Sequence, residues 1–189
     1  WTPNGVPTAT NTASITTASV YPVISSGTAV AARVFLYGSG VGLTINTGAT
    51  LTLSNTIDKI VYVYNSAILT NNGTLNITNT STTLSGTSGI ALDNGIVNNY
   101  GSITINSSSN RGISAGINSS FNNKTGGILT INVQDGGIAL ANGALNNEAS
   151  ALVNITATGF SFSIDGGMLT NTGQINATGR IENYTPGQA

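Results

Sequence analysis

An asparagine recurs at a fixed interval through most of this chain. The positions are Asn71, Asn99, Asn123, Asn147 and Asn171, so one interval of 28 residues is followed by three of 24. A constant period of this length, kept by one residue type, is typical of a chain wound into coils in which each residue lies above its copy. We therefore expect a stack of asparagines whose side-chain amides hydrogen-bond to one another, a structural role that we favour over ligand binding.

Other residue types recur at fixed distances from this asparagine, so that each forms a column of stacked copies. Two residues before the asparagine the chain carries Leu69, Val97, Phe121, Leu145 and Leu169. Eight residues before it lie Val63, Ala91, Ala115, Ala139 and Ser163, which we expect to form a third small or apolar column. Five residues before it lie Ser66, Asn94, Asn118 and Asn142, of types that favour turns. The pattern predicts about three short strands in each coil, separated by turns.

Short stretches such as "TLNITN" and "SITINSS" alternate apolar with polar residues, which is the period of a strand with one buried face. No stretch has helical spacing over a useful length, and the abundant Thr, Asn, Ser and Gly are poor in helix interiors. The fold class predicted is therefore all-β, a right-handed parallel β-helix (β-solenoid) with about 24 residues per coil. We expect about eight coils at most, each rising about 4.8 Å.

The chain divides into residues 1–40, expected to be an N-terminal cap and first irregular coil, and residues 41–189, expected to be one continuous solenoid. An imperfect early coil fits Leu43 and Ile45, with Asn46 near the phase of the asparagine column. A terminal coil exposes apolar side chains and strand edges, so atypical residues there usually act as a cap. The candidates for this cap, and for an assembly surface, are Trp1, Pro3, Val6, Tyr21 and Pro22.

The C-terminal end carries no comparable sequence. Ile175, Ile181 and Tyr184 are the candidate assembly edge, although Pro186 and the polar tail could simply blunt it. An open coil that docks on the first coil of another copy makes a head-to-tail contact, which generates a filament when it does not close. A fragment of a longer repeat protein would have the same sequence pattern.

Two stretches resemble known surface proteins. "WTPNGVPTATNTASIT", followed by "YPVISSGTAVAARVFLYGSGVGLTINTGATLTLSN", resembles a segment that recurs in large secreted surface proteins of Bacteroidetes. The similarity covers about residues 1–55, and the later "NNGTLNI" and "NNYGSITI" are similar in style to filamentous-haemagglutinin-type adhesin repeats. The resemblance implies export, of the type IX secretion kind, and an extracellular or cell-surface location. It implies no functional residues.

Composition excludes several partners. Charged residues make up 6% of the chain and the net charge is −1, so no basic stripe for nucleic acid is expected. No apolar run approaches the ~20 residues that span a bilayer, so no membrane span is expected. Low net charge permits association between copies, and we expect a homo-oligomer.

Catalysis, metals and cofactors are not expected. The chain has no histidine, the commonest general base and a frequent metal ligand. Asp93, Asp135 and Asp165 each precede glycine or Asn-Gly, where aspartate is a turn residue. The sequence therefore indicates no catalytic, cofactor-binding or metal site.

Two functional classes follow from these observations. The first is a structural protomer of an extracellular fibre or surface matrix. The second is an adhesin module that binds a glycan or another surface through a lateral face, for which tyrosines such as Tyr62, Tyr64, Tyr100 and Tyr184 could stack on sugars. We favour the first, because every regular feature serves stacking and no face is expected to concentrate aromatic or charged groups.

Overall fold

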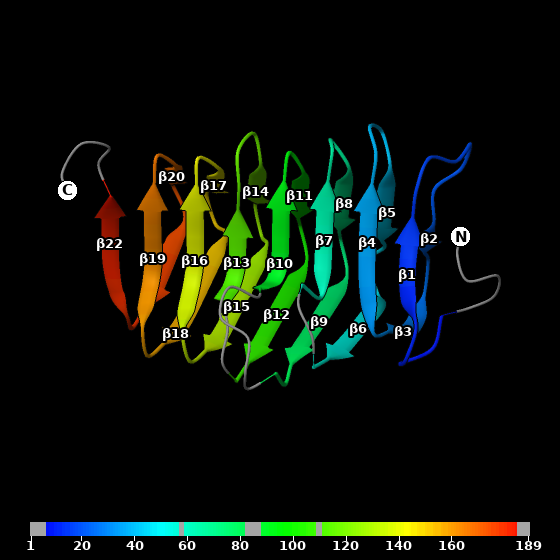
Figure 1. Cartoon of the computed structure of the whole chain (residues 1–189), viewed down its shortest axis with the longest axis horizontal. Coiled ribbons are helices and arrows are strands. Elements are labelled where there is room, and N and C mark those ends of the chain that lie inside the picture. The colour runs from blue at the N-terminus through cyan, green and yellow to red at the C-terminus, as the bar shows by residue number, and fades with distance from the viewer. Residues whose placement is uncertain (1–6, 57–58, 82–87, 109–110, 185–189) are drawn as a thin grey trace.

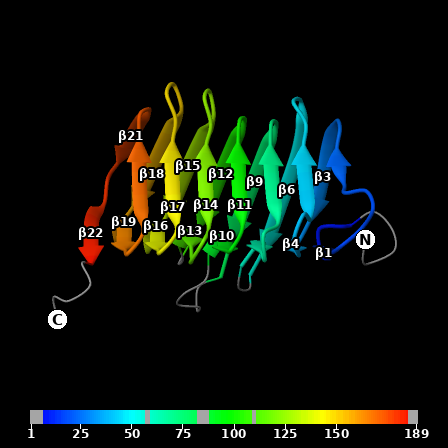
Figure 2. The same ribbon diagram turned by 90° about the horizontal axis from the view of Figure 1, so that it is seen from above.

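The chain forms a parallel β-solenoid. The structure is a computed structural model, which describes residues 7–56, 59–81, 88–108 and 111–184. These residues form twenty-two strands and no helix, arranged in three parallel sheets that run along one axis. Figures 1 and 2 show the coils side by side from the N-terminal to the C-terminal end. The predicted fold class is confirmed.

Each coil contributes one strand to each sheet, which we call sheets A, B and C. Sheet A contains β1 (Thr12–Ile15), β4 (Arg33–Tyr37), β7 (Val61–Tyr64), β10 (Ser88–Asp93), β13 (Arg111–Ala115), β16 (Gly136–Ala141), β19 (Phe160–Asp165) and β22 (Arg180–Tyr184). Sheet B contains β2 (Val23–Ile24), β5 (Gly42–Ile45), β8 (Ile68–Asn71), β11 (Ile96–Asn99), β14 (Ser120–Asn123), β17 (Ala144–Asn147) and β20 (Met168–Asn171). Sheet C contains β3 (Gly27–Ala31), β6 (Ala49–Asn55), β9 (Thr74–Asn79), β12 (Ser102–Ser107), β15 (Ile128–Val133), β18 (Leu152–Ala157) and β21 (Gln174–Ala177).

The winding is right-handed. In Figure 1 the strands of sheet A point upward at the front, the chain crosses the top to sheet B at the back, and successive coils advance from right to left. The same hand is favoured wherever twisted parallel strands are joined by a crossover. The described residues complete seven such coils, and β22 begins the next one.

Alternation builds the core. Along β7 the buried Val61 and Val63 alternate with the half-buried Tyr62 and Tyr64. The inward side chains of all three sheets form one continuous apolar cluster, from Ala13 in the first coil to Phe162 near the last. Because every coil hydrogen-bonds to the coil on either side, the backbone of an inner coil is satisfied by its neighbours.

The polar column predicted for turns lies at the corner between sheets A and B. Ser66, Asn94, Asn118 and Asn142 have φ of 64°, 51°, 55° and 61°. Gly166, at the same phase in the last coil, has φ of 64°. Asparagine and glycine tolerate this left-handed conformation better than most residues, which explains why the corner restricts residue type.

One column was assigned wrongly from the sequence. The inward column of sheet A pairs Val63 with Leu92, and then continues through Ala115, Leu140 and Ile164. Ala91, Ala139 and Ser163 are one residue earlier and belong to the outer face. The corner between sheets A and B explains the difference, because Val63 lies eight residues before its asparagine and Leu92 only seven. A fixed offset from the asparagine cannot follow a corner of variable length.

Some corners require glycine because backbones approach closely. A Cβ on Gly101, between β11 and β12, would lie 2.1 Å from the carbonyl oxygen of Gly73 in the preceding coil. Two backbones that are already hydrogen-bonded cannot separate locally without disturbing the stack.

Gly101→Ala is therefore expected to destabilise the fold by about 1 to 3 kcal/mol, the usual cost of overpacking. Gly42→Ala is the matched control, because its Cβ would lie 3.7 Å from the nearest atom, the carbonyl oxygen of Ile68. Its effect is expected to stay within about 0.5 kcal/mol. Urea unfolding of both variants measures the difference, and equal losses would contradict the close-approach explanation.

Candidate functional site

The five asparagines are stacked in register in sheet B. Each Nδ2 donates to the Oδ1 of the next asparagine toward the C-terminus, at 2.8 Å from Asn71, 2.8 Å from Asn99, 2.9 Å from Asn123 and 2.8 Å from Asn147. Each Nδ2 also donates to a backbone carbonyl that opens a strand of sheet C, namely that of Ser102, Ile128, Leu152 or Gln174. The amides therefore join sheet B to sheet C as well as coil to coil.

We call this stack of five inner asparagines the ladder, and it begins at Asn71. Ile45, and not Asn46, is in register with Asn71 in the preceding coil. The apolar pattern sets this register, because Leu43 pairs with Leu69 two residues earlier. The buried Oδ1 of Asn71 consequently has no hydrogen-bond partner among the described residues. This unpaired buried oxygen is destabilising, and it arises because the polar column begins next to the apolar side chain of Ile45.

A second asparagine row runs on the outside of sheet B. Asn122 donates to the Oδ1 of Asn98 at 2.9 Å, and Asn146 donates to that of Asn122 at 2.8 Å. These bonds point toward the N-terminus, opposite to those of the inner ladder. This row was not predicted, although the Asn-Asn doublets at 98–99, 122–123 and 146–147 indicate it.

The burial of the ladder predicts a graded response to substitution. Asn123 is fully buried between two asparagines, so Asn123→Leu removes one of the two acceptors of the Asn99 Nδ2 and the donor to the Oδ1 of Asn147. We expect it to cost about 2 to 4 kcal/mol. Asn171→Leu is the control, because Asn171 is exposed and the change removes only the acceptor for Asn147. Chemical unfolding should rank Asn123→Leu clearly above the control, and the reverse order would exclude a buried ladder as a stabilising element.

The corner after the ladder carries one ion pair between coils. Lys124 Nζ lies 2.7 Å from Glu148 Oε1, and the N–H of Thr125 donates to Glu148 Oε2 at 3.2 Å. The hydrogen bond from Lys124 holds the pKa of Glu148 below its ordinary value of 4.5, and the same bond raises the pKa of Lys124 above 10.5. The pair is partly exposed, so its contribution to stability is screened.

The pKa shifts of Glu148 and Lys124 determine the pH range over which their ion pair stabilises the fold. The stabilisation from Glu148 is complete above pH 4.5 and is lost as the pH falls through its lower folded pKa, whereas that from Lys124 is complete below pH 10.5 and is lost as the pH rises. In Lys124→Met the pKa of Glu148 should rise toward its ordinary value, as a carboxyl NMR titration would measure. The pKa of Glu182 serves as the internal control and should not move. An unchanged Glu148 would show that the pair does not form in solution.

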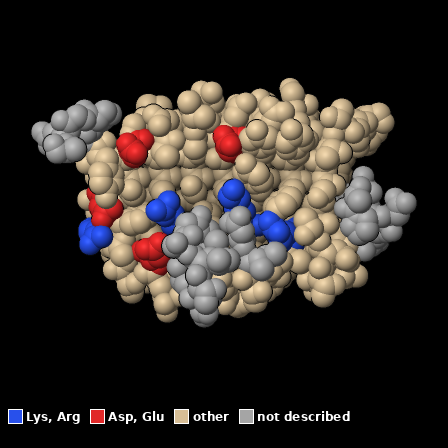
Figure 3. All heavy atoms as spheres, viewed as in Figure 1, with Lys and Arg blue, Asp and Glu red and all other residues tan. Residues whose placement is uncertain are grey.

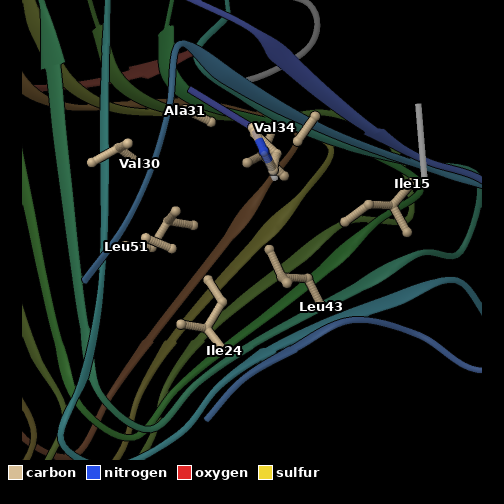
Figure 4. Close-up of a pocket in the computed structure, with 10 residues that line it drawn as sticks. Ile15, Ile24, Val30, Ala31, Val34, Leu43 and Leu51 are labelled. Carbon is tan, nitrogen blue, oxygen red and sulfur yellow. The ribbon is translucent and has the colours of Figure 1, made fainter. Parts of the chain in front are cut away.

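The N-terminal end contains an apolar hollow of about 330 Å³. Figure 4 shows the side chains that surround it, including Ile15, Ile24, Val34, Leu43 and Leu51. Several inward residues of this first coil are small, among them Ala13, Ala29 and Ala31, which leaves space inside the winding.

The described part of the predicted N-terminal cap lies around this first coil. Tyr21 is half-buried and packs against the core, and the carbonyl of Pro22 accepts the N–H of Thr44 at 3.2 Å. Pro7, which was not among the predicted cap residues, is buried and lines the hollow. Trp1, Pro3 and Val6 lie outside the described residues.

The C-terminal end is more open. Ile175 is half-buried against the core, whereas Ile181 and Tyr184 are 67% and 55% exposed. Within the described chain, β20, β21 and β22 are the terminal strands of their sheets, each paired on one side only. The backbone groups on the other side of these strands can pair with a further strand.

The outer face of sheet A gathers aromatic and charged side chains, contrary to the expectation that no face does so. Phe35, Tyr37, Tyr62 and Tyr64 form a cluster on β4 and β7 with ring centroids 5.1 to 6.0 Å apart. Four of the five cationic residues lie where strands of sheet A begin, namely Arg33, Lys59, Arg111 and Arg180. Figure 3 shows the basic side chains on this face. Residues far apart in sequence meet here, so a search for contiguous motifs overlooks the face.

Two carboxylates meet at the C-terminal part of this face. Asp165 and Glu182 line a hollow of about 340 Å³ together with Arg111, Phe160 and Tyr184. Glu182 accepts hydrogen bonds from Arg180 and, at 3.0 Å, from the hydroxyl of Tyr184. The bond from Arg180 lowers the pKa of Glu182, and the bond to Glu182 raises the pKa of Tyr184. A carboxyl held ionised in this way does not suit a general acid.

Comparison with other proteins gives no relative. No protein-family model, curated protein or solved structure matches the chain. The described residues contain no group of three or more carboxylates that could hold a metal ion, and no helix in them is long and apolar enough to cross a membrane. The geometry of the ladder, of the two ends and of the sheet A face is therefore the basis for a functional proposal.

Proposed function

We propose that this chain is a non-catalytic structural protomer of an extracellular fibre or surface matrix, and that copies associate end to end. The observation that carries the proposal is the pair of unlike ends. One end holds an apolar hollow, and the other presents the partly covered side chains of Leu169 and Ile175. Each end of the described chain also has three strands with one unpaired edge. The extracellular location rests on the resemblance of about residues 1–55 to secreted surface proteins.

The sizes of the side chains at the two ends support a head-to-tail contact. The first coil places Ala13, Ala29 and Ala31 inward beside Ile15 and Ile24 and leaves a hollow, whereas the last coil offers Leu169 and Ile175, both only partly covered. A second copy stacked in the same sense would cover these side chains and pair the open edges. Because the two contacting surfaces differ, such a contact repeats without closing unless its rotation forms a ring.

Ile181→Lys tests this contact. Ile181 lies on the terminal strand β22 and is 67% exposed, so lysine should leave the coil folded while placing a charge in the contact. Ile117→Lys is the control, since Ile117 is 59% exposed at a corner of a middle coil. Electron microscopy and sedimentation should show filaments for the natural sequence and for Ile117→Lys, and shortened or absent filaments for Ile181→Lys.

Monomeric rods for the natural sequence, or equal effects of the two lysines, would contradict the end-to-end contact. Thermal melts should show similar transitions for both variants, which separates a loss of assembly from a loss of folding. Monomeric rods would instead favour the second candidate function, an adhesin module that binds through a lateral face. The aromatic cluster on sheet A is the observation that favours it.

A further inference from the structure

The aromatic cluster on sheet A is not required by the solenoid core. Phe35 pairs with Tyr62 and Tyr37 with Tyr64, all on the outer side, while the inward residues of the same strands fill the interior. In later coils the outer position next to Tyr62 is held by the small residues Ala91, Ser114, Ala139 and Ser163. The same fold is therefore built without aromatic rings at this position in four other coils.

The four rings form one continuous patch across two coils. Phe35 and Tyr62 meet edge to face with centroids 6.0 Å apart. Tyr64 stacks on Tyr37 at 5.1 Å and on Tyr62 at 5.5 Å. The side chain of Tyr37, at the end of β4, is 53% exposed. Mutual stacking restricts these rings, so a ligand that contacts them orders little that is not ordered already.

Two cations border the patch at the edge where the strands begin. The Arg33 guanidinium lies 4.2 Å from the centre of the Phe35 ring, and the Lys59 ammonium lies 4.6 Å from that of Tyr62. The Nε of Arg33 also donates to the backbone carbonyl of Lys59 at 3.0 Å, which anchors the guanidinium at this edge. The carboxylate of Asp93, in register with Tyr64, lies at the opposite edge, where the strands end. The patch is thus positive at one edge and negative at the other.

This combination matches an acidic sugar. Aromatic faces offer apolar area for the C–H side of a sugar ring, and tyrosine hydroxyls offer hydrogen bonds to its hydroxyl groups. Arginine and lysine at one edge suit a carboxylate or sulfate group, which arginine can bind through two parallel hydrogen bonds. We propose that the outer face of β4 and β7 binds an acidic polysaccharide, with the sugar rings on Tyr37 and Tyr64 and the anionic group toward Arg33 and Lys59.

This binding face rests on the second candidate function, the adhesin module, and gives that module a location and a ligand class. It does not depend on filament assembly, because the patch lies on a lateral face and not at an end. In an assembled fibre each protomer would present one copy of the patch, and a long polysaccharide could then contact several copies at once.

Calorimetry with three hexasaccharides tests the proposal: a galacturonic acid hexamer, a sulfated heparin hexamer and a neutral glucose hexamer. The Ile181→Lys chain is used alongside the natural sequence, so that binding is measured whether or not filaments form. At least one acidic hexamer should bind about tenfold more tightly than the neutral one, and the two acidic arms distinguish carboxylate from sulfate recognition. Raising the salt concentration from about 0.05 to about 0.5 M should weaken binding of the acidic hexamers.

Variants locate the site. Tyr37→Ala and Tyr64→Ala should each weaken binding of the acidic hexamer by about tenfold or more, and Tyr64→Phe should retain most of it. Tyr100→Ala is the matched control, because Tyr100 is 50% exposed but lies at a corner outside the cluster. Circular dichroism melts establish that each variant is folded.

Absence of binding in all three arms would overturn the proposal, as would equal affinity for acidic and neutral hexamers or an equal effect of Tyr100→Ala. None of these outcomes bears on end-to-end association, which the Ile181→Lys and Ile117→Lys pair measures separately.

Discussion

The pairing of each coil with the next is the constraint on which the whole molecule depends. Parallel strands in register bring equivalent residues of successive coils above one another, so each side chain lies next to its counterparts in the neighbouring coils. A buried polar residue in such a stack is least costly when its copy supplies a hydrogen-bond partner. Apart from the Oδ1 of Asn71, the inner asparagines meet this condition by bonding to one another and to sheet C.

Much of the architecture could be predicted from the sequence because stacking copies residue types from coil to coil. The asparagine period predicted the coil length, and the turn residues Asn94, Asn118 and Asn142 marked the corner between sheets A and B. The inward column of sheet A was misplaced at Ala91 and Ala139, because the corner varies by one residue. The beginning of the ladder was also missed, since the register at Ile45 depends on the pairing of Leu43 with Leu69.

The sheet A face was less accessible to prediction for a different reason. Its outer residues are not copied from coil to coil, so Phe35, Tyr62, Ala91 and Ser114 succeed one another without a common type. Periodicity detects what the fold requires of every coil. Departures from the period mark positions that the fold leaves unconstrained, which is where a binding surface can be added without loss of stability.

The amide rows also give the rod an electrical direction. The four bonds of the inner ladder all point from the N-terminal toward the C-terminal coil. Four Asn–Asn bonds on the outside of sheets B and C point the opposite way, but they lie nearer the solvent, where water screens them more strongly than the buried row. Aligned amide dipoles add, so the inner row contributes partial positive charge toward the C-terminal coil and partial negative charge toward the N-terminal coil. Rods that met in opposite senses would bring like poles together, whereas rods that follow one another would place unlike poles in contact.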